Sequence, residues 1–115
     1  MVRTLAVLLG INGGGLSLEI GSMATSFGHD VFHSLTLKSK TVAFIVSQPS
    51  TEVFKQAILN HQDTVFVQQG CPIKISFDLH IFRVIITFTD GSEAIFGLRQ
   101  IETFLEVLRF TPEPM

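Results

Sequence analysis

The chain has 115 residues, and its eight Lys and Arg and ten Asp and Glu side chains give a formal net charge of −2. This length accommodates one domain with a hydrophobic core and is too short for two, so we expect a single domain over residues 1–115. Neither charge sign clusters along the chain, which argues against nucleic acid or an anionic membrane surface as a partner. The longest apolar runs, residues 5–11 and 42–46, fall far short of the roughly 20 residues of a membrane-spanning helix.

The single cysteine, Cys71, cannot form a disulfide within the chain, so nothing in the sequence requires an oxidising compartment. The apolar N-terminal run is followed by Asn12 and a run of glycines, and not by the small-residue pattern of a signal-peptide cleavage site. A strand explains this run better than a signal peptide does. We therefore expect a cytoplasmic location.

Short runs rich in β-branched and aromatic residues alternate with turn residues along the whole chain, which is typical of an all-β domain. We expect strands at residues 3–11, 16–20, 31–37, 41–47, 53–60, 64–67, 73–78, 82–89, 93–98 and 103–110. The strongest local signal is Asp90-Gly91 between two such runs, because this pair suits a hairpin turn. No internal repeat is apparent. Many short strands in one small domain predict an antiparallel sandwich or barrel.

Two segments also fit helices. Residues 51–59 place Phe54, Ala57 and Ile58 at helical spacing and follow Pro49 and Ser50, which is typical of a helix start. Residues 101–108 are ambiguous in the same way. A helix at either place would change the fold class from all-β to α+β.

An ordered series of features begins at Thr64. The sequence VFVQQG at residues 65–70 precedes the strand IKISFD at 73–78, the Asp90-Gly91 hairpin follows, and FGLR stands at 96–99. This series resembles the galectin (S-type lectin) family, in which a similar turn precedes a strand ending in Phe-Asp and a later strand ends in Phe-x-x-Arg. The resemblance implies an antiparallel two-sheet β-sandwich of the galectin and concanavalin-like jelly-roll type.

Galectins hold a β-galactoside with a His-Phe-Asn-Pro-Arg run on one strand, an Asn on the next strand, a stacking Trp, and a Glu with an Arg beyond it. The corresponding strand here reads AFIVSQP at residues 43–49, and the chain contains no Trp. By the resemblance, the residues left for a carbohydrate-binding role are Ser47, Asn60 and Gln62. It therefore implies a galectin-like binding protein with a degenerate galactoside site, whose ligand is an atypical glycan, a glycoprotein or a protein.

Catalysis is not expected from the residues. The four His residues are scattered, and Gly13-Gly14-Gly15 lacks the Lys-Ser/Thr ending of a phosphate loop. His29 and His33 are four residues apart but lie in a predicted loop and strand, so they do not form a metal pair. We expect no metal and no other cofactor.

Two further interpretations stay open. In the first, the chain is a structural or protein-interaction β-sandwich that binds no carbohydrate, and the apolar strand at residues 5–11 supports a homodimer, as galectin sandwiches pair side by side. In the second, the chain is an unrelated small β domain, which a helix over residues 53–59 would favour. The galectin resemblance adds secretion without a signal peptide to the expected cytoplasmic location.

Overall fold

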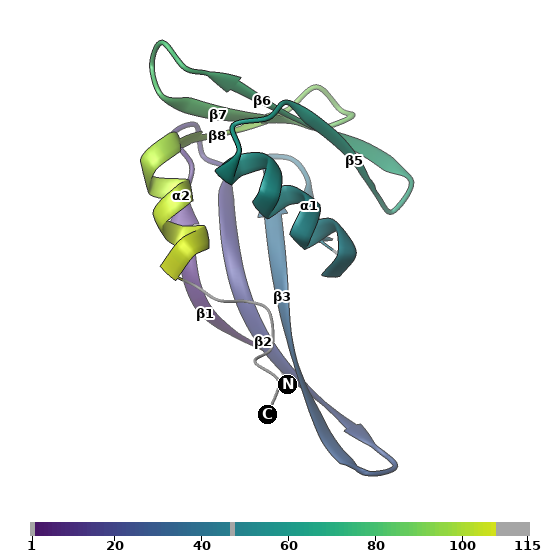
Figure 1. Cartoon of the computed structure of the whole chain (residues 1–115). Coiled ribbons are helices and arrows are strands. Elements are labelled where there is room, and N and C mark those ends of the chain that lie inside the picture. The colour runs from purple at the N-terminus through teal and green to yellow at the C-terminus, as the bar shows by residue number, and fades with distance from the viewer. Residues whose placement is uncertain (1, 47, 108–115) are drawn as a thin grey trace.

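A computed structural model describes residues 2–46 and 48–107 as two four-stranded antiparallel sheets, each followed by a short helix (Figure 1). The first sheet comprises β1 (Val2–Leu9), β2 (Gly15–Thr25), β3 (Gly28–Lys38) and β4 (Ala43–Val46), and helix α1 (Gln48–Leu59) follows it. The second sheet comprises β5 (Thr64–Gln68), β6 (Cys71–Asp78), β7 (Arg83–Thr87) and β8 (Glu93–Gly97), and helix α2 (Leu98–Val107) follows it. The fold is mostly β and is not a closed barrel.

Each sheet is a meander in which consecutive strands are neighbours, in the orders β1-β2-β3-β4 and β5-β6-β7-β8. A jelly roll consists of Greek keys, in which one strand returns by a long connection to lie beside an earlier one. The described strands make no such return. The antiparallel two-sheet arrangement is therefore confirmed, whereas the jelly-roll connection that the galectin resemblance implies is not shown.

The strands predicted at residues 53–60 and 103–110 are wrong where the structure describes them, because α1 covers residues 53–59 of the first segment and α2 reaches residue 107 of the second. In α1, the buried side chains of Phe54, Ala57 and Ile58 follow the helical period. In α2, Ile101 and Leu105 do the same. Both segments have these residues at helical spacing in the sequence. Burial of the helical face stabilises the helix more than the β propensity of the neighbouring β-branched and aromatic residues stabilises a strand. The helix over residues 53–59 argues against the galectin assignment.

The order of the elements repeats, since four strands and a helix occur twice. The first strand of each half and the turn after it carry the same spacing, with Thr4, Val7 and Gly10 in one and Thr64, Val67 and Gly70 in the other. No repeat was expected from the sequence, because the two halves share little beyond this pattern.

One hydrophobic core joins the two sheets and both helices. It includes side chains from β2, β3 and β4, from β5 to β8 and the β7–β8 loop, and from α1 and α2: Leu16, Leu18, Leu35, Leu37, Val46, Phe54, Ala57, Ile58, Phe66, Ile73, Ile75, Val84, Ile86, Phe88, Ala94, Phe96, Leu98, Ile101 and Leu105. Phe54 of α1 meets Phe66 of β5 edge-on, with ring centroids 6.3 Å apart. The helices therefore supply buried side chains to the same core as the two sheets.

The predicted Asp90 hairpin is confirmed, because β7 and β8 pair antiparallel around it. Its loop is longer than a two-residue turn: Gly91 N donates to Phe88 O, and only Gly91 of the loop has a positive φ, of 85°. The Asp90 carboxylate accepts hydrogen bonds from Ser92 and from Thr41 of the β3–β4 loop. These bonds stabilise the charged carboxylate and hold the pKa of Asp90 below its ordinary value of 3.8. The bond from the Ser92 side chain has the largest effect, and the bond from Thr41 the next largest. They also join the turns of the two sheets.

Candidate functional site

Two of the three predicted carbohydrate-binding residues, Asn60 and Gln62, lie at the end of α1. Ser47 lies outside the described residues. Asn60 follows the last residue of α1, where it is exposed and its side-chain amide nitrogen lies 3.4 Å from Gln56 Oε1. Because a helix stands where the resemblance needs a strand ending at Asn60, this residue loses the position on which its sugar-binding role depends.

Gln62 belongs to the cap that ends α1. Its backbone N–H donates to Ala57 O at 2.9 Å, and the His61 N–H donates to Ile58 O at 3.3 Å. This pair of bonds, with the positive φ of 50° at His61, is the Schellman arrangement that satisfies the last carbonyls of a helix. His61 Nε2 also lies 3.0 Å from Glu102 Oε1, which joins the end of α1 to α2. The backbone of Gln62 therefore has a structural role.

The side chain of Gln62 lines a groove of about 430 Å³ between α1 and the start of β5. Val53 and Ala57 supply its apolar part, and Glu52, Gln56, Gln62 and Thr64 supply its polar part. The groove is shallow and contains no convergent set of titratable groups. It is a space beside a sheet edge and not a catalytic cleft.

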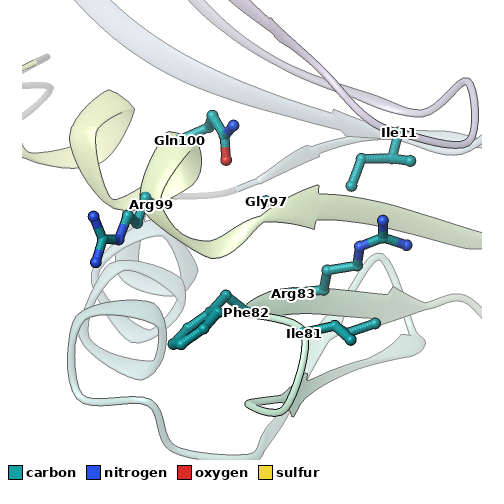
Figure 2. A pocket seen from close by; sticks show the side chains of 7 residues that line it. All are labelled: Ile11, Ile81, Phe82, Arg83, Gly97, Arg99 and Gln100. Carbon is teal, nitrogen blue, oxygen red and sulfur yellow. The ribbon is translucent and has the colours of Figure 1, made fainter.

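A second pocket, of about 390 Å³, lies where three connections meet (Figure 2). Ile11 comes from the β1–β2 turn, Ile81, Phe82 and Arg83 come from the β6–β7 loop and the start of β7, and Gly97, Arg99 and Gln100 come from the junction of β8 and α2. Two backbone hydrogen bonds fix these connections to one another. Ile11 N donates to Ile95 O at 2.7 Å, and Leu98 N donates to Phe82 O at 2.8 Å.

Large apolar side chains around this pocket are exposed. Ile11, Ile81 and Phe82 line it, and Leu79 stands in the same loop, each with more than half of its surface accessible to solvent. A loop normally places polar residues in water, so three large apolar side chains within residues 79–82 are unusual. An exposed apolar cluster of this kind marks an interaction site more often than a random surface does.

Phe82 has a strained backbone. Its φ is 53°, in the left-handed region that a bulky L-residue avoids, and its ring is 60% exposed. A hydrogen bond from the N–H of Leu98, the first residue of α2, to the carbonyl of Phe82 holds this conformation. Strain of this kind persists where the surrounding structure enforces it, and it is concentrated at functional positions.

Two arginines flank the apolar cluster on different sides. In β7, Arg83 pairs with Gly97, which has no side chain, and Figure 2 shows Arg83 extending toward Ile11. Arg99 projects from the start of α2 in another direction. Among the described residues, neither arginine has an acidic partner within salt-bridge distance. The pocket therefore has an apolar centre between two separated positive charges.

The described lining of this pocket contains no His, Cys, Asp or Glu, and no group of metal-binding side chains occurs in the described part of the chain. The lining offers apolar contact, the attraction of anions by two guanidinium groups, and hydrogen bonding by the Gln100 amide. We missed Phe82 and Ile11 as site residues from the sequence; the apolar loop at residues 79–82 was the available signal, whereas the approach of Ile11 depends on a long-range contact. None of the described helices has the length and hydrophobicity to cross a membrane.

Comparison with known proteins gives no match for this chain. No protein-family model matches the chain, and no curated protein and no solved structure matches it either. The galectin resemblance therefore has no support from these comparisons. The pocket and the sheet edges are the basis for any functional conclusion.

Proposed function

We propose that this chain is a protein-interaction domain and that the pocket at the β6–β7 loop binds an extended segment of a partner protein. The supporting observation is the exposed apolar cluster between two arginines without described acidic partners. Aromatic and Arg side chains are enriched in the energetically dominant parts of protein interfaces. Phe82 is the central contact of this surface, because its ring is exposed although its positive φ is unfavourable for a bulky residue.

The arrangement of charge defines the partner's chemistry. Because Arg83 and Arg99 extend in different directions, one small anion would not engage both guanidinium groups. A peptide segment can reach both if it carries an apolar side chain with carboxylates on either side of it. The apolar side chain would fill the pocket against Ile11 and Phe82, and each carboxylate would form a charge-assisted hydrogen bond with one arginine.

A lining without nucleophile or acid–base groups supports binding over catalysis at this pocket. A glycan is the ligand that the galectin resemblance implies, and an exposed Phe ring can stack on a sugar. The two separated cations favour an acidic peptide over a neutral sugar, because a neutral sugar leaves both charges without a partner.

Random peptides displayed on phage and selected on the wild-type protein test this proposal. We expect enrichment of sequences with Leu, Ile or Phe between Asp or Glu residues. Binding of a selected peptide, measured by fluorescence anisotropy, should weaken by about tenfold or more for Arg83→Glu and for Arg99→Glu, since each loses one charge-assisted bond. Arg3→Glu is the matched control, because exposed Arg3 lies on β1 outside this pocket.

Equal effects of Arg3→Glu and Arg99→Glu would mean that net charge alone drives binding, and the pocket would be rejected. Selection of no peptide, together with binding of a neutral glycan on an array, would replace the protein partner with a carbohydrate.

A further inference from the structure

The four sheet edges are protected to different degrees. Edge strands carry unpaired backbone groups, and proteins protect them with short strands, charges, bulges or covering segments. β4 is only four residues long. β1 has a bulge between Thr4 and Ala6, and the exposed Arg3 lies beside it. Each of these two edges therefore carries a feature that discourages pairing with another strand.

The outer edge of β8 is covered by the β1–β2 turn. Ile11 N donates to Ile95 O at 2.7 Å, and Ile95 N donates to Asn12 Oδ1 at 3.0 Å. The Asn12 side-chain N–H donates in turn to Glu93 O at 2.8 Å. A side chain and a turn thus occupy the backbone groups that a further strand would use.

β5, at the other edge of the same sheet, is also short, at five residues, but the described residues show no bulge, charge or covering turn on it. Its sequence, TVFVQ, contains no charge and no proline, and its register with β6 is continuous. Val65 and Val67 are 60% and 62% exposed. No described strand pairs with its outer side. Among the four edges of the described sheets, this edge is therefore the most open to another strand.

The register shows which backbone groups face outward. Gln68 pairs with Cys71 across the two-residue turn Gln69-Gly70, whose φ values are 52° and 76°. The closing pair of such a hairpin is hydrogen-bonded, and bonded pairs alternate along an antiparallel ladder. Val67, opposite Pro72, is therefore in a non-bonded pair, and so is Val65. The N–H and C=O groups of both valines point away from β6.

We infer that β5 pairs with β5 of a second copy of this chain, antiparallel about a two-fold axis at Phe66. The strand is close to a palindrome, since Val65 and Val67 stand symmetrically around Phe66. Under this axis, Val65 of one copy lies opposite Val67 of the other, and their outward backbone groups hydrogen-bond to each other. The two sheets become one continuous eight-stranded sheet, with valine side chains in contact on its outer face.

A second copy fits this edge because β5 has no side chain that would repel an identical strand. The pairing brings no two like charges opposite each other, since β5 has no charged residue. The groove between α1 and the start of β5 lies beside this edge. The surface differs from the strand at residues 5–11 first expected to support a homodimer, where the bulge at β1 interrupts the edge. It also does not depend on the pocket at the β6–β7 loop.

Two double variants of equal size test both the surface and its register. In Val65→Lys/Val67→Lys, the two-fold axis places each introduced lysine opposite a lysine of the other copy, and we expect the dimer to weaken by at least about a hundredfold. In Val65→Lys/Val67→Glu, the same axis places each introduced lysine opposite a glutamate of the other copy, and we expect the dimer to remain. Sedimentation equilibrium over a concentration series measures the dissociation constant. Val7→Lys/Leu9→Lys, at exposed positions of β1, is the control and should dimerise like the wild type.

The substituted side chains are already exposed, so all variants should fold, which circular dichroism checks. Amide exchange of Val65 and Val67, followed by NMR, should slow as protein concentration rises. A wild-type protein that stays monomeric at high concentration overturns the inference. So does a dimer that the Lys/Glu variant loses as fully as the Lys/Lys variant, or one that only the β1 variant disrupts.

Discussion

Replacing Phe82 by glycine should separate backbone strain from ligand binding. The φ of 53° costs an L-residue roughly 1–2 kcal/mol relative to the right-handed region, and glycine does not incur this cost. Glycine also loses about 0.5–1 kcal/mol more conformational entropy on folding than alanine. The difference leaves Phe82→Gly more stable than Phe82→Ala by about 0.5–1 kcal/mol. Both variants lack the ring, so the loss of ring contacts cancels between them.

Ile81 provides the control, because it lies next to Phe82, is similarly exposed, and is not among the positive-φ residues. There the strain is absent, and Ile81→Gly should be less stable than Ile81→Ala by about 0.5–1 kcal/mol. Urea unfolding with a common slope gives all four free energies of unfolding. Phe82→Gly should also lose binding of the selected peptide despite its greater stability than Phe82→Ala. If alanine is at least as stable as glycine at position 82, the strain at Phe82 is not real and the reasoning fails.

Further predictions concern the turns, the core and the ligand. Because the pKa of Asp90 is lower in the folded state, its carboxylate contributes stability that is present above pH about 4 and is lost as pH falls through the folded-state pKa. The Tm of Asp90→Asn should therefore fall less than the Tm of the wild type between about pH 6 and about pH 3. Phe54→Ala should cost about 3–5 kcal/mol in chemical unfolding, because Phe54 is fully buried against Phe66. On a glycan array, we expect no lactose-sensitive binding, and Asn60→Ala should leave the profile unchanged; competition by lactose would restore the galectin interpretation.

Much of the strand pattern could be predicted from the sequence because burial alternates locally. In β6, Ile73 and Ile75 are buried while Lys74 between them is exposed, which is the period of a half-buried strand. The Asp90 hairpin was equally local. The α1 helix was also encoded locally, in the spacing of Phe54, Ala57 and Ile58. It was assigned to a strand because short runs rich in β-branched and aromatic residues recur along the whole chain, and this segment was grouped with them.

The strand order and the pocket could not be predicted because they depend on contacts between distant segments. Local periodicity does not distinguish two sequential meanders from strands that cross between sheets. The pocket forms only because the β1–β2 turn bonds to β8, bringing Ile11 to the β6–β7 loop. The left-handed backbone of Phe82 has no signal in its own residue type, since such a conformation favours glycine. Long-range bonds impose it.

The two proposed surfaces have a joint consequence. The β6–β7 loop lies at the end of the second sheet away from the β5–β6 turn, so strand pairing at β5 leaves the pocket of each copy open (Figure 1). A dimer then presents two identical pockets in a fixed relation. A partner with two copies of the acidic segment gains avidity from simultaneous binding, provided that its linker spans the pockets. Val65→Lys/Val67→Lys should therefore weaken the binding of a tandem peptide and leave the binding of a single peptide unchanged. Equal losses of affinity for both peptides would show that the edge and the pocket are one binding surface.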